Sequence, residues 1–101
     1  NKLFSKKETD FLLEILPKDP ESITFSHNDL HADNILYLNK TDDYLFIDLE
    51  YSSYNYRGFD IANLFVESMI DYHNPNPPFY RINEELYPPE TEFKDFVNYY
   101  T

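Results

Sequence analysis

The sequence has no cysteine and no tryptophan, and Gly58 is the single glycine among its 101 residues. Without cysteine there is no disulfide framework and no thiolate metal site. With one glycine the chain cannot form a glycine-rich phosphate-binding loop. No apolar run approaches the roughly 20 residues of a membrane-spanning helix, and the start lacks a signal-peptide pattern. These absences predict a soluble, cytoplasmic protein.

Basic residues are also scarce, because 8 Lys and Arg stand against 19 Asp and Glu, which gives a formal net charge of −11. This charge repels polyanions and attracts cationic ligands, so it argues against nucleic acid and anionic membrane surfaces as partners. Hydrophobic residues make up 42% of the chain, enough for a packed core. The length fits a small domain or part of a larger one. Because the chain starts at Asn1 rather than Met and stops within a helical pattern, we expect 1–101 to be a partial domain.

The first half of the chain predicts one helix followed by three short strands. Residues 5–8 (SKKE) match a capping box, and apolar residues at helical spacing follow until Pro17 stops the helix. Strand formers occupy 23–25, and two further strands at 35–38 and 44–47 are separated by the turn residues NKTDD. We expect these last two strands to pair as a β-hairpin.

The second half predicts two helices separated by loops. Residues 51–58 (YSSYNYRG) show no period and are expected to form a loop. Asp60 is expected to cap a helix whose apolar face continues to Tyr72, and a proline-punctuated loop follows. A last helix is expected to begin at Thr91 or Glu92. The predicted fold class is therefore mixed α/β, of the α+β type.

The chemistry-bearing residues concentrate in 25–36 (FSHNDLHADNIL) and at the end of the predicted hairpin. Phosphoryl transfer to an alcohol needs a carboxylate that accepts the hydroxyl proton and an amide oxygen that helps to hold a metal on the phosphates. Asp29 and Asn34 lie five residues apart, which is the spacing of a kinase-type catalytic loop. Asp48 follows the second hairpin strand, where a kinase places its principal magnesium ligand. The order of base, amide and metal carboxylate is therefore complete.

These motifs together resemble the choline/ethanolamine kinase family. Residues 25–36 are similar to the phosphotransferase signature HNDxxxxNIL, and 47–67 (IDLEYSSYNYRGFDIANLFVE) is similar to the family signature almost residue for residue. The resemblance implies a protein-kinase-like C-lobe fragment with a short β-hairpin bearing the catalytic and metal loops, flanked by helices. It implies ATP and Mg²⁺ as cofactors and phosphorylation of choline in phosphatidylcholine biosynthesis. The ATP-binding lobe would be missing, so we expect the chain alone to be inactive.

The same resemblance assigns roles in the reaction to four residues. Asp29 would be the catalytic base, and His27 would brace the catalytic loop. Asn34 and Asp48 would hold magnesium on ATP. Oxygen ligands of this kind suit Mg²⁺, which keeps several waters and shares the remaining positions with phosphates.

A further group of residues is implied to bind the amino alcohol or to organise the loops. Glu67 and Tyr72 would contact the cation, which suits a quaternary ammonium because ring faces and carboxylates recognise it. His31 lies near the substrate, at a position where choline kinases usually carry Gln. Four residues are implied to organise the loops around the site: Glu50, Arg57, Asp60 and Asn63.

Several alternatives remain open at the level of sequence. One alternative is that the phosphate acceptor is ethanolamine instead of choline. Another is that the chain is a truncated, non-catalytic module whose acidic, aromatic surface binds a protein. His27 and His31 have a spacing that binds a transition metal when it lies on a helix, although here it is expected on a loop. Asp and Asn at strand ends are also common in ordinary turns. A structural ion network is as good an explanation of Glu50, Arg57 and Asp60 as direct contact with the ligand. The resemblance also leaves a homodimer of the parent protein open.

Overall fold

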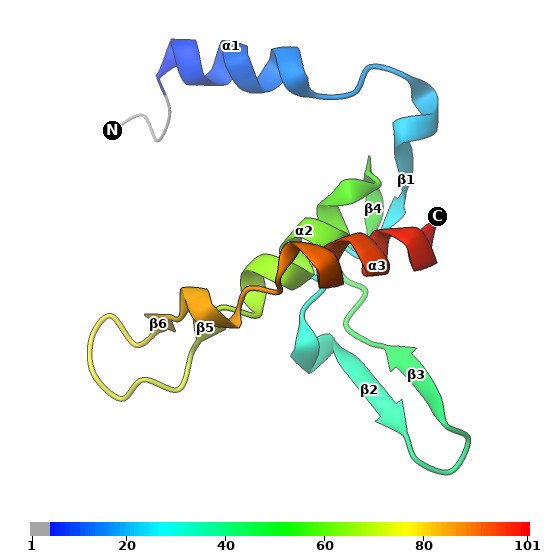
Figure 1. The fold of residues 1–101 in the computed structure, drawn as a ribbon, viewed down its shortest axis with the longest axis vertical. Coiled ribbons are helices and arrows are strands. Elements are labelled where there is room, and N and C mark those ends of the chain that lie inside the picture. The colour runs from blue at the N-terminus through cyan, green and yellow to red at the C-terminus, as the bar shows by residue number, and fades with distance from the viewer. Residues whose placement is uncertain (1–4) are drawn as a thin grey trace.

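The computed structural model describes residues 5–101, which form three α-helices, short two-stranded sheets and single turns of 3-10 helix (Figure 1). The α-helices are α1 (Lys6–Ile15), α2 (Gly58–Glu67) and α3 (Glu90–Tyr100). The strands are β1 (Ile23–Ser26), β2 (Ile35–Leu38), β3 (Asp43–Phe46), β4 (Ser53–Tyr56), β5 (Ile70–Asp71) and β6 (Arg81–Ile82). The 3-10 turns are η1 (Pro20–Ser22), η2 (Ala32–Asn34) and η3 (Glu84–Leu86).

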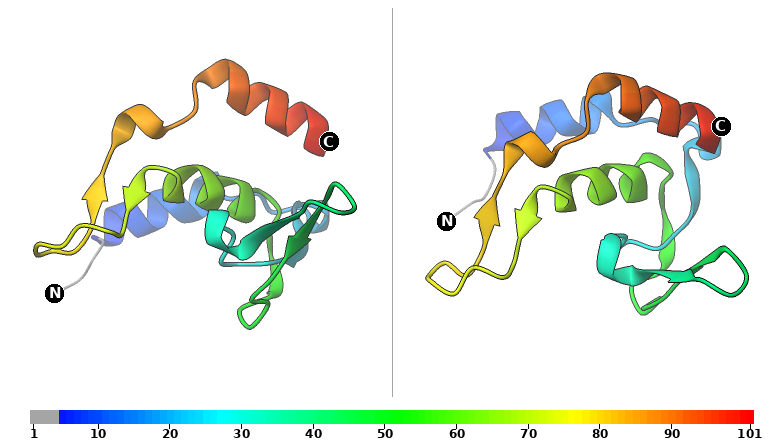
Figure 2. Two further views of the ribbon diagram at one scale, coloured as in Figure 1. Left: turned by 90° about the horizontal axis from the view of Figure 1, so that it is seen from below. Right: turned by 60° about the horizontal axis from the view of Figure 1, so that its bottom comes forward.

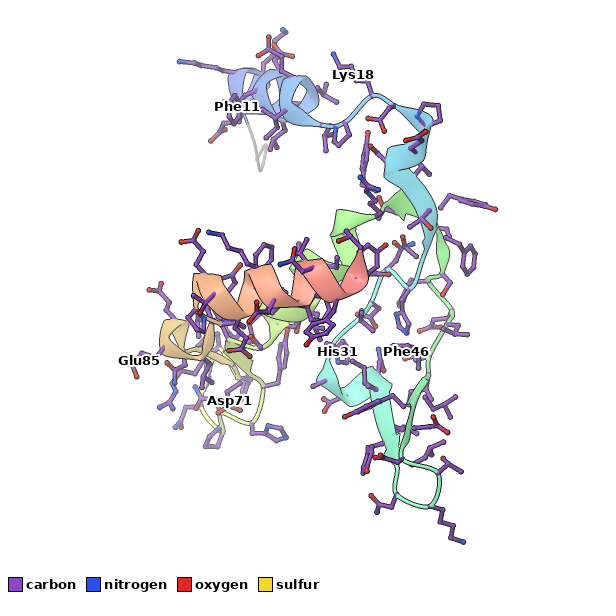
Figure 3. All side chains as sticks on the ribbon, turned by 45° about the vertical axis from the view of Figure 1, so that its right-hand side comes forward. Phe11, Lys18, His31, Phe46, Asp71 and Glu85 are labelled. Atoms are coloured by element: carbon purple, nitrogen blue, oxygen red, sulfur yellow. The ribbon has the colours of Figure 1, made fainter. Side chains whose placement is uncertain are left out.

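Helix α1 begins at the predicted capping box. The Glu8 backbone N–H donates to Ser5 Oγ at 3.2 Å, and the Ser5 N–H donates to Glu8 Oε2 at 2.7 Å. This reciprocal pair satisfies two of the orphan donors at the helix start. No residue of α1 is buried, and the helix stands apart from the rest of the ribbon in Figure 1 and, around Phe11, in Figure 3.

The predicted hairpin is confirmed, with β3 beginning one residue earlier than expected. Strands β2 and β3 pair antiparallel, with Leu36 opposite Leu45 and Tyr37 opposite Tyr44. The predicted loop over 51–58 is wrong, because β4 pairs antiparallel with β1 in a register that sets Ser26 opposite Ser53. Polar and aromatic residues alternate in β4 without an apolar face, so its strand character comes from its distant partner.

Helix α2 differs from the prediction at both ends. Arg57 occupies its N-cap without a side-chain hydrogen bond, and Asp60 lies inside the first turn, so the prediction that Asp60 caps this helix is wrong. The helix ends at Glu67, and Tyr72 therefore lies beyond it, after β5. Strand β5 pairs with β6, and the Asn83 N–H donates to the Met69 carbonyl at 2.7 Å, which draws the chain away from the helical path.

Phe65 on α2 is the centre of the apolar packing and is 7% exposed. Its ring centroid lies 6.3 Å from Tyr87, 5.1 Å from Phe93 and 5.3 Å from Phe96. These contacts bring η3 and α3 against α2, and both views in Figure 2 show α3 running alongside α2. The last helix begins at Glu90, one residue before Thr91, the earlier of the two predicted starts. No helix in residues 5–101 is long and apolar enough to cross a membrane.

Candidate active site

The predicted catalytic loop is fixed by a carboxylate from the first turn of α2. The backbone N–H of His27 donates to Asp60 Oδ2 at 2.7 Å, and that of Asn28 donates to Asp60 Oδ1 at 2.8 Å. Hydrogen bonds to a charged acceptor are stronger than neutral ones. Asp60 therefore caps the loop that follows β1 instead of capping its own helix.

A second connection from α2 reaches the middle of the same loop. Asn63, one turn further along the helix, donates from Nδ2 to the Leu30 carbonyl at 3.0 Å. The loop thus meets α2 at both ends of the segment that contains Asp29.

The His27 ring joins the catalytic loop to the segment after β3. His27 is 9% exposed, and its Nε2 lies 2.7 Å from the Ile47 carbonyl oxygen. A carbonyl only accepts, so Nε2 carries the proton and Nδ1 is free to accept the Asp29 N–H at 3.2 Å. The imidazole therefore connects the backbone of Asp29 to the residue directly before Asp48.

Asp29, His31 and Asn34 lie together. Asn34 is 6% exposed, and its Nδ2 lies 2.9 Å from the Asp29 carbonyl oxygen, 3.4 Å from Asp29 Oδ2 and 3.2 Å from His31 Nε2. His31 Nε2 is also 3.8 Å from Asp29 Oδ2. The amide nitrogen faces this cluster, and the amide oxygen accepts no hydrogen bond from residues 5–101.

Asp48 lies beside Asn34 through the backbone, since the Ile47 N–H donates to the Asn34 carbonyl at 3.0 Å. Asp48 has a left-handed backbone with φ 61°. Its exposed carboxylate makes no hydrogen bond or ion pair with residues 5–101. An amide oxygen and a carboxylate are donors that suit Mg²⁺. No group of three or more His, Cys, Asp or Glu that could hold a metal occurs in the same range.

Glu67 and Tyr72 meet on the side of the loop that carries His31. The Tyr72 hydroxyl donates to Glu67 Oε2 at 2.8 Å. This hydrogen bond is the main cause that raises the pKa of Tyr72 above its ordinary value, and the negative charge of Asp29 adds to the rise. Both residues line a cavity of about 390 Å³ together with His31 and His73. The cavity places the predicted cation contacts next to the predicted catalytic loop.

Glu50 and Arg57 are not drawn into the same cluster. The Arg57 N–H donates to the Ser22 carbonyl at 2.8 Å. Its charge helps to lower the pKa of Asp19, after the larger effect of the Ser22 hydroxyl that bonds that carboxylate. Glu50 is exposed. Within residues 5–101 no ion pair joins these two residues to each other or to Asp60, so the ion network considered from the sequence is not formed there.

The sequence reasoning missed three residues next to the site. Asn28 hydrogen-bonds Ser53 and Asn55, on strand β4. Asn28 stands between His27 and Asp29 in the motif, which was the only local signal for it. Its partners become visible only once β4 is paired with β1.

Comparison with known proteins decides the family. The sequence profile described as Choline/ethanolamine kinase matches residues 3–101. The chain belongs to the choline/ethanolamine kinase family. The resemblance inferred from the motifs is thereby confirmed, and family members named in other organisms show how far the similarity extends.

Among these relatives, the human protein named Choline/ethanolamine kinase is 40% identical over 98 residues, covering 94% of this chain and 25% of the relative. Mouse Choline kinase alpha is 40% identical over 98 residues, covering 92% of this chain and 22% of the relative. The crystal structure of choline kinase from Cryptosporidium parvum Iowa II matches with a TM-score of 0.66 and 35% identity, over 95% of this chain and 26% of that one. This match confirms the mixed α+β fold. The chain thus spans about a quarter of the length of the choline/ethanolamine kinases it matches.

Proposed function

We propose that the chain supplies the catalytic loop of an ATP-dependent kinase that phosphorylates choline, as a cytoplasmic step of phosphatidylcholine biosynthesis. One observation carries the proposal: Asn34 donates from its side chain to Asp29 and accepts at its backbone from Ile47, next to Asp48. Asn34 thus links the proposed base Asp29 to the loop that carries the proposed metal ligand Asp48. By itself the 101-residue chain is proposed to be inactive, since it contains no glycine-rich loop.

Asp29 acts as the base in this proposal. Its side chain is 37% exposed, so an alcohol has access to the carboxylate, while its backbone is fixed by His27. The carboxylate accepts the hydroxyl proton as the oxygen attacks the terminal phosphorus of ATP. Asp60 and Asn63 position the base because they fix the backbone on both sides of it.

Asn34 and Asp48 would hold magnesium, which would neutralise charge on the phosphates when bound. The Asn34 side chain is suited to this because its amide nitrogen already faces Asp29 and its oxygen is left for the ion. His27 keeps Asp48 in register with the catalytic loop, since it bonds the carbonyl of the preceding residue.

The cavity beside His31 is the proposed acceptor site. A quaternary ammonium donates no hydrogen bond and is attracted to carboxylates and ring faces, which Glu67 and Tyr72 supply. The Tyr72 hydroxyl donates to Glu67, which keeps the ring next to that carboxylate and raises the pKa of the phenol. Several relatives bear the name choline kinase, which favours choline as the acceptor.

Replacement of the base is the first test. In the complete protein encoded by the gene, Asp29→Asn should lower turnover of choline by about 10²–10⁴-fold, the usual contribution of a positioned acid or base. Asp43→Asn, an exposed aspartate of β3 with no side-chain partner in residues 5–101, is the control and should keep full turnover. A loss of less than about tenfold in Asp29→Asn would remove the base assignment. Absence of turnover in the unsubstituted complete protein would favour a non-catalytic binding module.

Ethanolamine is the second candidate acceptor. Its primary ammonium donates hydrogen bonds, and Glu67 retains one carboxylate oxygen that does not accept from Tyr72. Choline and ethanolamine competing in one reaction mixture distinguish the two substrates, because the ratio of products gives the ratio of kcat/KM values. A preference for ethanolamine would keep the kinase proposal and change its acceptor.

A further inference from the structure

The side chain of Asn28 uses all of its hydrogen-bonding groups on one neighbouring segment. Its Nδ2 donates to the Tyr51 carbonyl at 2.9 Å and to Ser53 Oγ at 2.7 Å. Its Oδ1 accepts from Asn55 Nδ2 at 2.9 Å. The three partners alternate along 51–55, which covers the end of the loop after Asp48 and the first residues of β4. One amide therefore joins the catalytic loop to two points of β4 and to the residue two positions before this strand.

Asparagine is the residue that fits this position. The Tyr51 carbonyl and the Ser53 hydroxyl each accept a hydrogen bond here, and the Asn55 amide donates one. Position 28 therefore needs two donors and one acceptor at the end of a short side chain, which Asn supplies and Asp does not. The backbone of Asn28 is left-handed, with φ 67°, a region that Asn tolerates better than most residues. The Asn55 oxygen accepts from the Tyr56 N–H at 2.8 Å, which turns the Asn55 nitrogen toward Asn28.

The connection has a defined mechanical consequence. Asp29 follows Asn28 directly, and Asp48 lies three residues before Tyr51. Strands β1 and β4 lie side by side in Figure 1 and pair up to Ser26 and Ser53. The Asn28 contact to the Tyr51 carbonyl continues the connection beyond this last ladder pair. Slippage between the two loops would change the separation of the base from the metal carboxylate, and misplacement by about 1 Å can cost roughly 100-fold in rate.

We propose that Asn28, Ser53 and Asn55 form a positioning clamp that sets the register between the catalytic loop and the Asp48 loop. The inference rests on the proposed kinase function for its effect on turnover. The clamp itself is a property of the fold. None of its three residues touches the reacting atoms in this proposal, so they are positioning residues that act through Asp29 and Asp48.

Two adjacent serines give a matched experiment in the complete protein. Ser53 Oγ accepts from Asn28, whereas the buried Ser52 Oγ has no partner within residues 5–101. Ser53→Ala should lower kcat per folded molecule about 3- to 10-fold, as expected for one lost hydrogen bond, with KM for choline unchanged. Ser52→Ala should keep kcat, and Ser53→Thr should restore it because it keeps the hydroxyl. Equal kcat in the two alanine variants would overturn the clamp.

Hydrogen exchange gives a readout that does not depend on activity. Without nucleotide or metal, Ser53→Ala should speed exchange in a peptide covering 27–30 by about 3- to 10-fold, while Ser52→Ala leaves it unchanged. An equal change throughout β1 and β4, with a lower melting temperature, would indicate ordinary strand stabilisation and contradict the proposal. If the complete protein does not phosphorylate choline or ethanolamine but the exchange difference is seen, the kinase assignment fails and the clamp stands.

Discussion

The catalytic loop and helix α1 are stabilised in opposite ways. In the loop, Asp60, Asn63 and Asn28 make side-chain hydrogen bonds that reach 20 or more residues along the chain. The buried polar residues of the described chain gather around this loop and the strand before it: Ser22, Ser26, His27 and Asn34. In α1 the polar contacts are local and no residue is buried. These hydrogen bonds therefore fix the geometry of the loop, whereas α1 presents apolar side chains that no other element in residues 5–101 covers.

This contrast predicts that single atoms matter in the loop and little in α1. Polar contacts over long sequence separation fix one geometry, and removal of one partner leaves buried donors unsatisfied. An amphipathic helix gains most of its stability from packing of its apolar face. Three substitutions, from the largest expected effect to the smallest, test the difference.

Asp60→Asn should have the largest effect of the three. The oxygen of the new amide still accepts one hydrogen bond, but its nitrogen only donates. One of the two backbone N–H groups, that of His27 or that of Asn28, therefore loses its acceptor. The lost charge-assisted bond corresponds to about 2 kcal/mol, or roughly a 30-fold lower turnover of choline in the complete protein. Steady-state kinetics with thermal melting would measure both quantities. Asp95→Asn on the exposed side of α3 is the control, and equal behaviour of the two variants would contradict the anchoring role of Asp60.

Glu67→Gln should have an intermediate effect, confined to the acceptor site. Loss of the negative charge is expected to raise KM for choline about tenfold while kcat changes less. Glu92→Gln, an exposed glutamate of α3, is the control. An unchanged KM would place the cation elsewhere.

The same variant has a consequence for the pKa of Tyr72. The hydrogen bond to Glu67 is the main cause of the raised value, so Gln at 67 should bring the pKa back down toward its ordinary value near 10. A raised pKa favours the neutral phenol in the folded protein, so this contribution to stability is present below pH 10 and is lost as the pH rises through the folded-state value. NMR titration of the tyrosine ring carbons would follow the change.

Ser5→Ala should have the smallest effect. It removes the capping box at an exposed helix end, for which the usual cost is about 1 kcal/mol or less of helix stability. Turnover should stay unchanged, because α1 makes no contact with the catalytic loop among the described hydrogen bonds. Circular dichroism and the same kinetic assay would measure the two quantities. A loss of activity comparable to that of Asp60→Asn would break the contrast between the two regions.

Local signals explain which parts of the fold were predictable. The capping box at Ser5 and the hairpin around the NKTDD turn depend on neighbouring residues, and the structure confirms both. Strand β4 depends on β1, about 30 residues earlier, so nothing within 51–58 indicated it. The helix after Gly58 was predicted too long because Tyr72 falls at helical spacing, while the pairing of β5 with β6 ends the helix first.

The candidate site divides in the same way. The sequence motifs predicted which residues carry chemistry, and the structure brings Asp29 to Asn34 and Glu67 to Tyr72. The roles of these residues stay predictions. The supporting contacts were not predictable, since the partners of Asp60 lie 33 and 32 residues away. Asp60 was therefore predicted to cap its own helix, which is the common local use of aspartate.

The backbone of Asp48 has a consequence for how the site would evolve. Its left-handed conformation is unfavourable for a residue with a Cβ and costs nothing sterically to glycine. The one glycine of the chain lies instead at Gly58, where a Cβ would meet open space. A library of variants of this protein that is selected for thermal stability alone should therefore accumulate glycine at position 48. Every variant with that glycine would lose the proposed magnesium ligand.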